Sequence, residues 1–367
     1  MPHDDSALAR SRYFAALDSI EGIAEIETGG KPHRFARLPH AGLILRLYPG
    51  IAVATTVAAA ATFLSQHYGA PVMLFALLIG MGFHFLHAEA RCAAGIEFCS
   101  RTVLRLGVGL LGMRITASEI AGLGLGPILI ILACVASTIL FGAWLARRLR
   151  LGTAFGLLSG GAVAICGASA ALAIASVLPV HKNSERDTIL AIVAVTTLST
   201  LAMIFYPLLV AALRLDQVHA GIFLGGTIHD VAQVVGAGYM ISPQTGDVAT
   251  YIKLLRVATL IPVVTGFALA FANGEDRRKD FRRPPVPFFL IGFAALVLLN
   301  SLVRLPVGLA GAVADGSSWC LVTAIAALGM KTSFRDLLAV GWRPIGLMAA
   351  ETAWIALLVL AAIEFLL

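Results

Sequence analysis

Polar side chains cluster in the middle of one apolar segment, residues 217–240, which contains Thr227, His229, Asp230 and Gln233. On a helix, Gln233 lies four residues from His229 and three from Asp230, so these three side chains can share one hydrated face. An aspartate at mid-membrane is costly unless it is paired or hydrated, and therefore indicates function. We predict that His229 and Asp230 form the coupling site and that Thr227 and Gln233 contact substrate. A structural polar network between helices is the alternative.

A second apolar segment, residues 153–178, has a centre that is wrong for a plain membrane helix. Its small and hydroxyl residues there are Ser159, Gly160, Gly161, Gly167, Ala168 and Ser169. Glycine is a poor helix former, and an opened helix is tolerated in a bilayer only against protein or a water-filled cavity. A half-helix that starts near Gly161 or Gly167 would aim N–H groups and a positive dipole end into that cavity, which suits an anion. We predict that these residues, Ala168 excepted, bind substrate; close helix packing through small residues is the alternative.

Basic and acidic residues also fall inside apolar segments. Arg256 offers fixed, bidentate donors to an oxyanion, and we predict that it binds substrate; the alternative is a counter-ion for Asp230. Lys253 lies near a segment end, where its ammonium group can reach the interface. For Arg105 and Glu351 we expect structural roles.

Signatures of catalysis and of cofactors are missing from the sequence. The five cysteines form no CxxC pair, so neither a disulfide framework nor a metal cluster is indicated. The run SGGAV at 159–163 lacks the G-x-S-x-G pattern of a hydrolase, and there is no P-loop or dinucleotide fingerprint. We expect no enzyme activity, no metal and no cofactor, apart from a coupling Na⁺ or H⁺.

The composition indicates the class of protein that must position these residues. The 367-residue chain is 59% hydrophobic and 13% charged, with a mean hydropathy of +0.88, as in polytopic membrane proteins. Its net charge of +6 reports membrane topology and not nucleic-acid binding. Eleven apolar segments are present, at 47–66, 71–87, 101–115, 125–146, 153–178, 188–212, 217–240, 250–272, 286–303, 311–330 and 345–366.

These segments predict an all-α polytopic membrane protein with about 11 transmembrane helices, of which at least one is discontinuous. Residues 46–367 form the predicted transmembrane transporter domain. Residues 1–45 form a cytoplasmic N-terminal segment, whose hydrophobic periodicity predicts an amphipathic helix on the membrane surface or on a partner.

The basic residues between the segments predict which side of the membrane each loop faces. If all eleven segments cross, 20 Lys and Arg residues lie on one side and 4 on the other. Because basic loops stay in the cytoplasm, we expect the N-terminus and residues 275–283 there, and residues 181–186 in the periplasm. The same split disfavours a re-entrant hairpin at 217–240.

An internal repeat occurs at an offset of 217 residues. Residues 111–128 read LGMRITASEIAGLGLGPI, and residues 328–345 read LGMKTSFRDLLAVGWRPI. The two copies are separated by an odd number of segments, so they are expected to run in opposite directions. Inverted repeats of this kind are typical of secondary transporters.

Four motifs in this order resemble the sulfate exporter family of bacterial inner-membrane proteins: LLGMRIT, LSGGAVAICGASAALAIASVLP, GGTIHDVAQVVGAGYMI and IKLLRVATLIP. The resemblance covers about residues 45–367. More distantly, the run from GMRIT to VTTLST is similar to the bile acid–sodium symporter fold, which implies broken helices crossing at the midplane and a cavity near Gly160, Gly161 and Gly167. The two Gly-Gly segments run the same way if every segment crosses, so the partner that crosses 153–178 stays open.

Taken together, these features predict a multi-pass secondary transporter of the bacterial inner membrane that moves a small anion by alternating access. The resemblance alone makes export of sulfate, or of a related sulfur oxyanion or sulfonate, the first choice. A sodium- or proton-coupled organic-acid carrier and an anion channel are the alternatives. The expected partners are the anion and the lipid bilayer, without nucleic acid; a homodimer stays open.

Overall fold

The computed structural model describes residues 39–69, 71–122, 124–179, 183–271, 288–303, 307–332 and 342–366, and every regular element in these ranges is helical. The predicted amphipathic helix falls mostly within residues 1–38, which lie outside the described residues. Residues 39–45 belong to the first described helix and not to a separate N-terminal segment.

Each of the eleven predicted apolar segments contains helix where the structure describes it, and this confirms an all-α polytopic membrane protein. Among the described residues, six helices are long and apolar enough to cross a membrane, and four shorter apolar helices accompany them. The elements are α2 (Pro39–Tyr68), α3 (Val72–Gly82), α4 (Phe85–Ala88), α5 (Ala90–Phe98), η1 (Cys99–Val103), α6 (Leu104–Leu111), α7 (Ala117–Gly122), α8 (Gly126–Arg148), α9 (Thr153–Ala164), α10 (Ala168–Ala175), α11 (Ser184–Leu213), α12 (Gln217–Thr227), α13 (Val231–Ile241), α14 (Pro243–Ala258), α15 (Leu260–Phe271), α16 (Phe288–Leu302), α17 (Val307–Lys331) and α19 (Trp342–Leu366).

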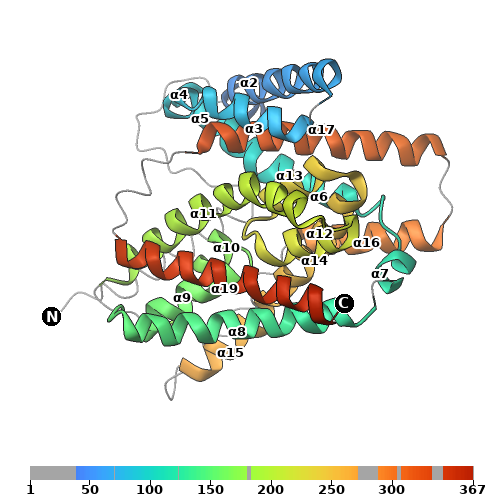
Figure 1. Cartoon of the computed structure of the whole chain (residues 1–367). Helices are drawn as coiled ribbons and strands as arrows, with labels where there is room; N and C mark the ends of the chain where they lie inside the picture. Colours follow the sequence, from blue (N-terminus) through green and yellow to red (C-terminus); the bar gives the residue numbers. More distant parts are fainter. Residues whose placement is uncertain are drawn as a thin grey trace.

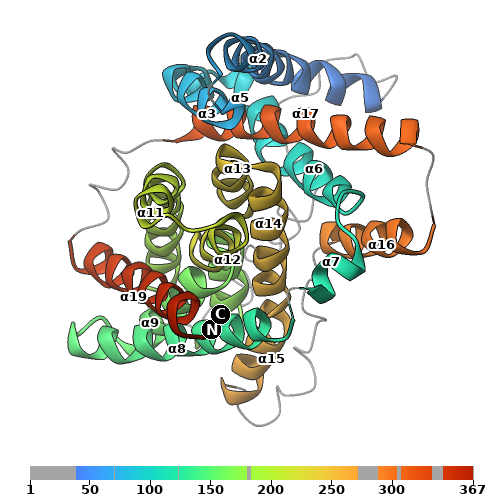
Figure 2. The same ribbon diagram turned by 45° about the vertical axis from the view of Figure 1, so that its right-hand side comes forward.

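The helices form two groups that lie side by side. One group contains α2, α3, α5, α6 and α17; the other contains α8, α9, α11, α12, α14 and α19 (Figures 1 and 2). Helix α13 lies between them and contacts both α17 and α11. Small residues allow close packing within the second group: a Cβ atom on Gly156 of α9 would lie 2.5 Å from the carbonyl oxygen of Gly142 in α8.

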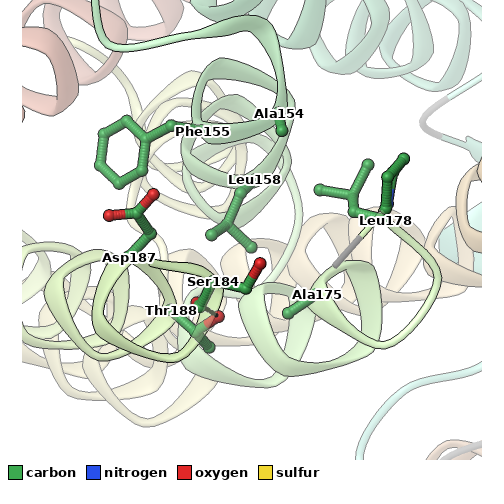
Figure 3. A pocket seen from close by; sticks show the side chains of 9 residues that line it. Ala154, Phe155, Leu158, Ala175, Leu178, Ser184, Asp187 and Thr188 are labelled. Carbon is green, nitrogen blue, oxygen red and sulfur yellow. Dashed lines mark hydrogen bonds between the residues drawn. The ribbon is translucent and has the colours of Figure 1, made fainter. Parts of the chain in front are cut away.

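Helices α9 and α10 fold back on each other as a hairpin. Ala154 at the start of α9, Ala175 at the end of α10 and Ser184 at the start of α11 line one small hollow (Figure 3). Nearer the turn, a Cβ atom on Gly161 would collide with the Ile174 side chain. The chain therefore enters and leaves this hairpin on the same side of the bundle.

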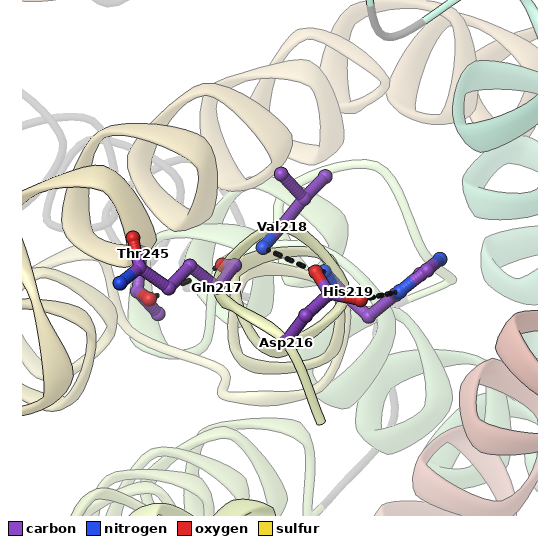
Figure 4. A network of polar contacts seen from close by, with 5 residues as sticks. All are labelled: Asp216, Gln217, Val218, His219 and Thr245. Carbon is purple, nitrogen blue, oxygen red and sulfur yellow. Dashed lines mark hydrogen bonds and ion pairs between the residues drawn. The ribbon is translucent and has the colours of Figure 1, made fainter. Parts of the chain in front are cut away.

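Helices α12 and α13 form a second hairpin. The Thr245 hydroxyl, at the start of α14, donates a hydrogen bond of 3.1 Å to the carbonyl of Gln217 at the start of α12 (Figure 4). The adjacent Asp216 caps α12 by accepting from the backbone amides of Val218 and His219. Since α14 follows α13 directly, the end of α13 must return to the level where α12 began.

Asp216 also accepts a hydrogen bond from the His219 ring (Figure 4). Partial burial raises the pKa of Asp216, but the hydrogen bonds from His219 and the two amides outweigh this effect and hold the pKa below its ordinary value. The base of the second hairpin is therefore fixed by a carboxylate that stays charged at neutral pH.

Helix α11 runs past both hairpins and shows that they point toward each other. In its middle, the Val195 side chain lies beside Gly167 at the turn of the first hairpin. One turn later, the Ser199 hydroxyl accepts from the Asp230 amide at the turn of the second, at 3.0 Å. Further on, the Tyr206 ring packs 5.1 Å from that of Phe223 in α12. The two tips therefore meet near the middle of α11.

This arrangement corrects the expected topology. The prediction that 153–178 and 217–240 each cross the membrane is wrong, because both segments double back. Charge counting missed this because each hairpin removes one crossing. Two hairpins therefore move only the loops between them to the other side of the membrane and leave all other loops where they were. Placing both hairpins moves Lys182 and Arg186 to the basic side and Arg214 to the other, so the split improves from 20 against 4 to 21 against 3. The hairpins enter from opposite sides, and the second is the partner that meets the first.

We therefore predict that residues 183 and 273 face the same compartment, the cytoplasm. A membrane-impermeant thiol reagent should label Asn183→Cys and Asn273→Cys from the cytoplasmic side and Arg214→Cys from the periplasmic side. Asn183 and Arg214 are exposed, so both sites are reachable. The unsubstituted chain measures the background from its own cysteines. If Asn183→Cys and Asn273→Cys are labelled from opposite sides, then residues 153–178 cross the membrane as a continuous span and the hairpin topology is wrong.

Candidate functional site

The turn of the first hairpin depends on Gly167. Helix α9 ends at Ala164, and α10 begins at Ala168 directly after Gly167, whose φ is 68° and ψ is −127°. Side chains with a Cβ atom rarely adopt this conformation, so glycine is required here. The prediction of a discontinuous helix that restarts at Gly167 is confirmed.

The other predicted residues of this segment lie before the break. Gly160 and Gly161 sit inside α9, where Gly160 packs against the backbone of Ile139 in α8. Ser159 is buried and donates to Glu351 of α19 at 2.7 Å. The expectation that the helix opens at Gly160 and Gly161 is therefore wrong. Gly160 brings α8 and α9 together, Gly161 makes room for the Ile174 side chain of α10, and the structure does not place these glycines or Ser159 at the tip.

The turn of the second hairpin lies between His229 and Asp230. Asp230 is the N-cap of α13 and accepts from the amide of Ala232 at 2.8 Å. His229 precedes the helix, so the predicted shared face of His229, Asp230 and Gln233 does not form. Gln233 turns instead toward α11, where its amide donates to the Thr200 hydroxyl at 2.8 Å, and its buried Oε1 has no partner among the described residues.

His229 joins the two hairpins to α19. Its fully buried ring lies 3.1 Å from the carbonyl of Val163 through Nδ1 and 3.0 Å from the hydroxyl of Thr352 through Nε2. A carbonyl can only accept, so Nδ1 must carry a proton. His229 belongs to the second hairpin but contacts the end of α9 in the first. Its hydrogen bond therefore connects the two tips.

Lys253 of α14 reaches both tips at once. Its ammonium group, which is fully buried, donates to the carbonyl of Ile165 at 2.7 Å and to that of Ile228 at 2.9 Å. These two carbonyls follow the last turns of α9 and α12, where no helical partner is available.

Arg256, one turn further along α14, continues the same pattern. Its Nε and Nη2 donate to the carbonyls of Ala164 and Val163, at 2.8 and 2.7 Å. Its Nη1 donates to those of Gly225 and Ile228, at 3.2 and 3.1 Å. The two cations therefore satisfy the orphaned carbonyls of both half-helices and lie at their negative dipole ends.

This geometry corrects the alternative proposed for Arg256. All its hydrogen bonds within the described residues go to backbone carbonyls and none to Asp230, so Arg256 is not the counter-ion of that carboxylate. Its guanidinium is fully buried behind the tips, away from the surface where Ser169 is exposed. The sequence led us to expect that Lys253 reaches the membrane interface. This expectation is wrong, because its ammonium group is buried and donates to carbonyls at both tips.

The opposite ends of the half-helices remain accessible. Ser169 in the first turn of α10 is exposed, and Ala168 and Asp230 are half-buried. No side chain caps the N-terminus of α10, whereas Asp230 caps that of α13. Thr227, in contrast, is buried and donates to the carbonyl of Phe223 at 2.6 Å, away from this face. Of the predicted residues, the structure thus brings together Gly167, Ser169 and Asp230.

The threonine hydroxyls in the middle of α11 take mainly local partners. Those of Thr196, Thr197 and Thr200 donate to carbonyls one turn earlier in α11. In the described part of the chain no group of three His, Cys, Asp or Glu residues could hold a metal ion.

Comparison with known proteins places the chain in a family. The model of the family described as conserved hypothetical protein 698 matches residues 49–348. A UPF0324 membrane protein of Chlorobaculum tepidum is 55% identical over 324 residues, which is 88% of this chain and 90% of the relative. The UPF0324 membrane protein TauZ of Paracoccus pantotrophus is 51% identical over 332 residues, 90% of this chain and 98% of the relative.

The chain therefore belongs to this family of multi-pass membrane proteins, and the family assignment drawn from its four motifs is confirmed. A further relative from Rhizobium meliloti, also a UPF0324 membrane protein, is 51% identical over 328 residues, 88% of this chain and 95% of the relative. No solved structure matches the chain at a significant level.

The carbonyl contacts of Arg256 yield a stability prediction. Arg256→Met should lower the free energy of unfolding by roughly 3 kcal/mol or more, because four hydrogen bonds are lost and each buried carbonyl left unpaired costs about 1–3 kcal/mol. The free energy of unfolding of Arg256→Lys should lie between those of the wild type and Arg256→Met, since one ammonium group cannot reach both hairpins as the guanidinium does.

Thermal melting in detergent measures both variants, and Arg214→Met, which removes an exposed arginine, is the matched control. A melting temperature of Arg256→Met equal to that of the control would show that the cation does not support the tips.

Proposed function

We propose that the chain is a secondary transporter that moves a small anion across the bacterial inner membrane by alternating access. The observation that carries the proposal is the meeting of two oppositely inserted hairpins in the middle of the helix bundle. In transporters, half-helix ends at the midplane supply backbone donors to substrate in a region that lipid never reaches.

The uncapped N-terminus of α10 is the proposed anion site. Its first amides and the exposed Ser169 hydroxyl are hydrogen-bond donors, and the helix dipole adds positive potential. Lys253 and Arg256 lie behind the tips and contribute positive charge without occupying the site. The Gly167 turn lets the backbone approach a ligand closely.

Substrate identity rests on the family resemblance, which makes sulfate or a related sulfur oxyanion or sulfonate the first anions to test. The membrane potential opposes entry of an anion and favours its exit, which is consistent with export. We place the N-terminus and the basic loops in the cytoplasm on the charge split.

Asp230 is the proposed coupling group. It is half-buried at the tip, on the accessible face, and its negative charge beside an anion site favours a cation or proton that travels with the substrate. As an alternative to a transporter, an anion channel needs no such group.

Counterflow in proteoliposomes tests the proposal most simply. Vesicles loaded with unlabelled anion should accumulate the labelled anion transiently and saturably if the chain is a carrier. Sulfate, a small alkyl sulfonate and a dicarboxylate form the panel. Electrical current without counterflow would identify a channel, and chemical conversion of the anion an enzyme.

For Asp230 we expect a specific loss of coupling. Asp230→Asn should keep the α13 cap, because asparagine caps as well as aspartate, and should change the free energy of unfolding by less than about 1 kcal/mol. It should nevertheless abolish the dependence of flux on the gradient of the coupling ion, H⁺ or Na⁺.

Asp216→Asn is the matched control, since Asp216 caps the other helix of the same hairpin but lies at the exposed base. If Asp230→Asn keeps as much gradient-driven flux as Asp216→Asn, then Asp230 only caps α13 and is not the coupling group.

A further inference from the structure

Glu351 of α19 is a carboxyl group buried in the second helix group, away from the hairpin tips. Its side chain is fully buried. Oε1 accepts a hydrogen bond from the Ser159 hydroxyl of α9 at 2.7 Å, and Oε2 has no partner among the described residues. The carboxyl fits into the space that Gly142 leaves in α8, since a Cβ atom there would collide with Oε1.

In the described part of the chain no basic side chain forms an ion pair with Glu351. Helix α19 packs against α8, α9, α11 and α12, and α9 has no titratable residue. The titratable side chains described on the other three are Cys134, Arg147, Arg148, Arg186, Asp187, Tyr206 and His219. None of them forms a hydrogen bond or ion pair with Glu351. His229 contacts Thr352, the next residue, but not Glu351.

A second acceptor lies in the same space beside Gly142. The carbonyl oxygen of Gly156 lies 3.4 Å from the Ser159 hydroxyl, and both this oxygen and Oε1 adjoin the vacant Cβ position of Gly142. A charged carboxylate here would have one donor, a neighbouring acceptor and no counter-ion inside a bilayer. Such groups are neutralised or paired in membrane proteins.

We propose that Glu351 is a proton-binding site: in this conformation Oε2 carries a proton, and the group is a neutral carboxylic acid that bridges α19 and α9. The proton forms an O–H bond at Oε2, while Oε1 keeps the hydrogen bond from Ser159. If α9 separates from α19 during transport, water reaches the carboxyl, which then releases the proton and becomes a carboxylate. This second step rests on the proposed function, whereas the protonated state does not.

The protonated state is tested on the whole protein by infrared spectroscopy at neutral pH. The wild type minus Glu351→Gln difference spectrum should contain the carbonyl stretch of a carboxylic acid, which a carboxylate lacks. Glu364→Gln, which changes an exposed carboxyl on the same helix, is the control and should leave that band in place. In Ser159→Ala the band should persist at higher frequency, because the carbonyl oxygen loses its donor.

Two outcomes would overturn the site: a difference spectrum without a carboxylic acid band, or a spectrum of folded Ser159→Ala in which the band position is unchanged. The Ser159→Ala measurement decides the matter even if Glu351→Gln fails to fold.

Flux against pH tests the release step separately. Wild-type flux should change by up to about tenfold per pH unit where Glu351 titrates, whereas Glu351→Gln should stay within about twofold. A purely structural glutamate would leave the pH profile unmoved in Glu351→Gln. An infrared band without measurable flux would refute the transport proposal and keep the proton site; flux with an unmoved profile would refute the release step alone.

Discussion

Lys253 and Arg256 hold together two three-residue helix breaks inside the membrane, at 165–167 and 228–230, by donating to the carbonyls at and just before those breaks. A helix cannot end in hydrocarbon with free carbonyl groups. The two cations meet this requirement for both hairpins from a single helix, α14, and in return the carbonyls solvate charges that a bilayer would otherwise reject. The meeting of the tips, the packing of α11 and the direction of the accessible helix ends all follow from this arrangement.

The two hairpins are alike in outline but differ at their N-terminal half-helix ends. Asp230 already caps the positive end of α13, whereas the residue before α10 is Gly167, which has no side chain to cap that helix. The tip of the first hairpin therefore has an uncapped helix N-terminus next to the exposed Ser169, and the tip of the second has the half-buried carboxylate of Asp230. An anion and a cation or proton can thus occupy neighbouring sites without an additional charged residue.

Much of the chemistry could be predicted from sequence, because buried charges and glycines are informative in any membrane segment. The functional role predicted for Asp230 from residue type and depth stays a prediction, whereas the helix break at Gly167 followed from residue type. The hairpins did not, since an apolar segment of about 20 residues has the same composition whether it crosses or doubles back. The role of Arg256 was hidden for the same reason: only the folded hairpins reveal which carbonyls need donors.

Glycine pairs illustrate the limit further. Gly160 and Gly161 allow α9 to pack against α8 and α10 within a continuous helix, whereas Gly167 alone takes a backbone conformation that requires glycine. Residue type alone does not tell the packing glycines, Gly160 and Gly161, from the turn glycine, Gly167. The composition supplied the membrane class and the resemblance supplied the family, whereas contacts between distant segments were needed to place the site.

The central claim is that the anion binds at the start of α10, and protection of a cysteine there tests it most directly. Ser169→Cys should react with a hydrophilic thiol reagent, and saturating transported anion should slow the reaction. Ser176→Cys, at the far end of the same helix, should react at a rate that the anion does not change. Equal rates for Ser169→Cys with and without an anion that the protein demonstrably transports would contradict the account.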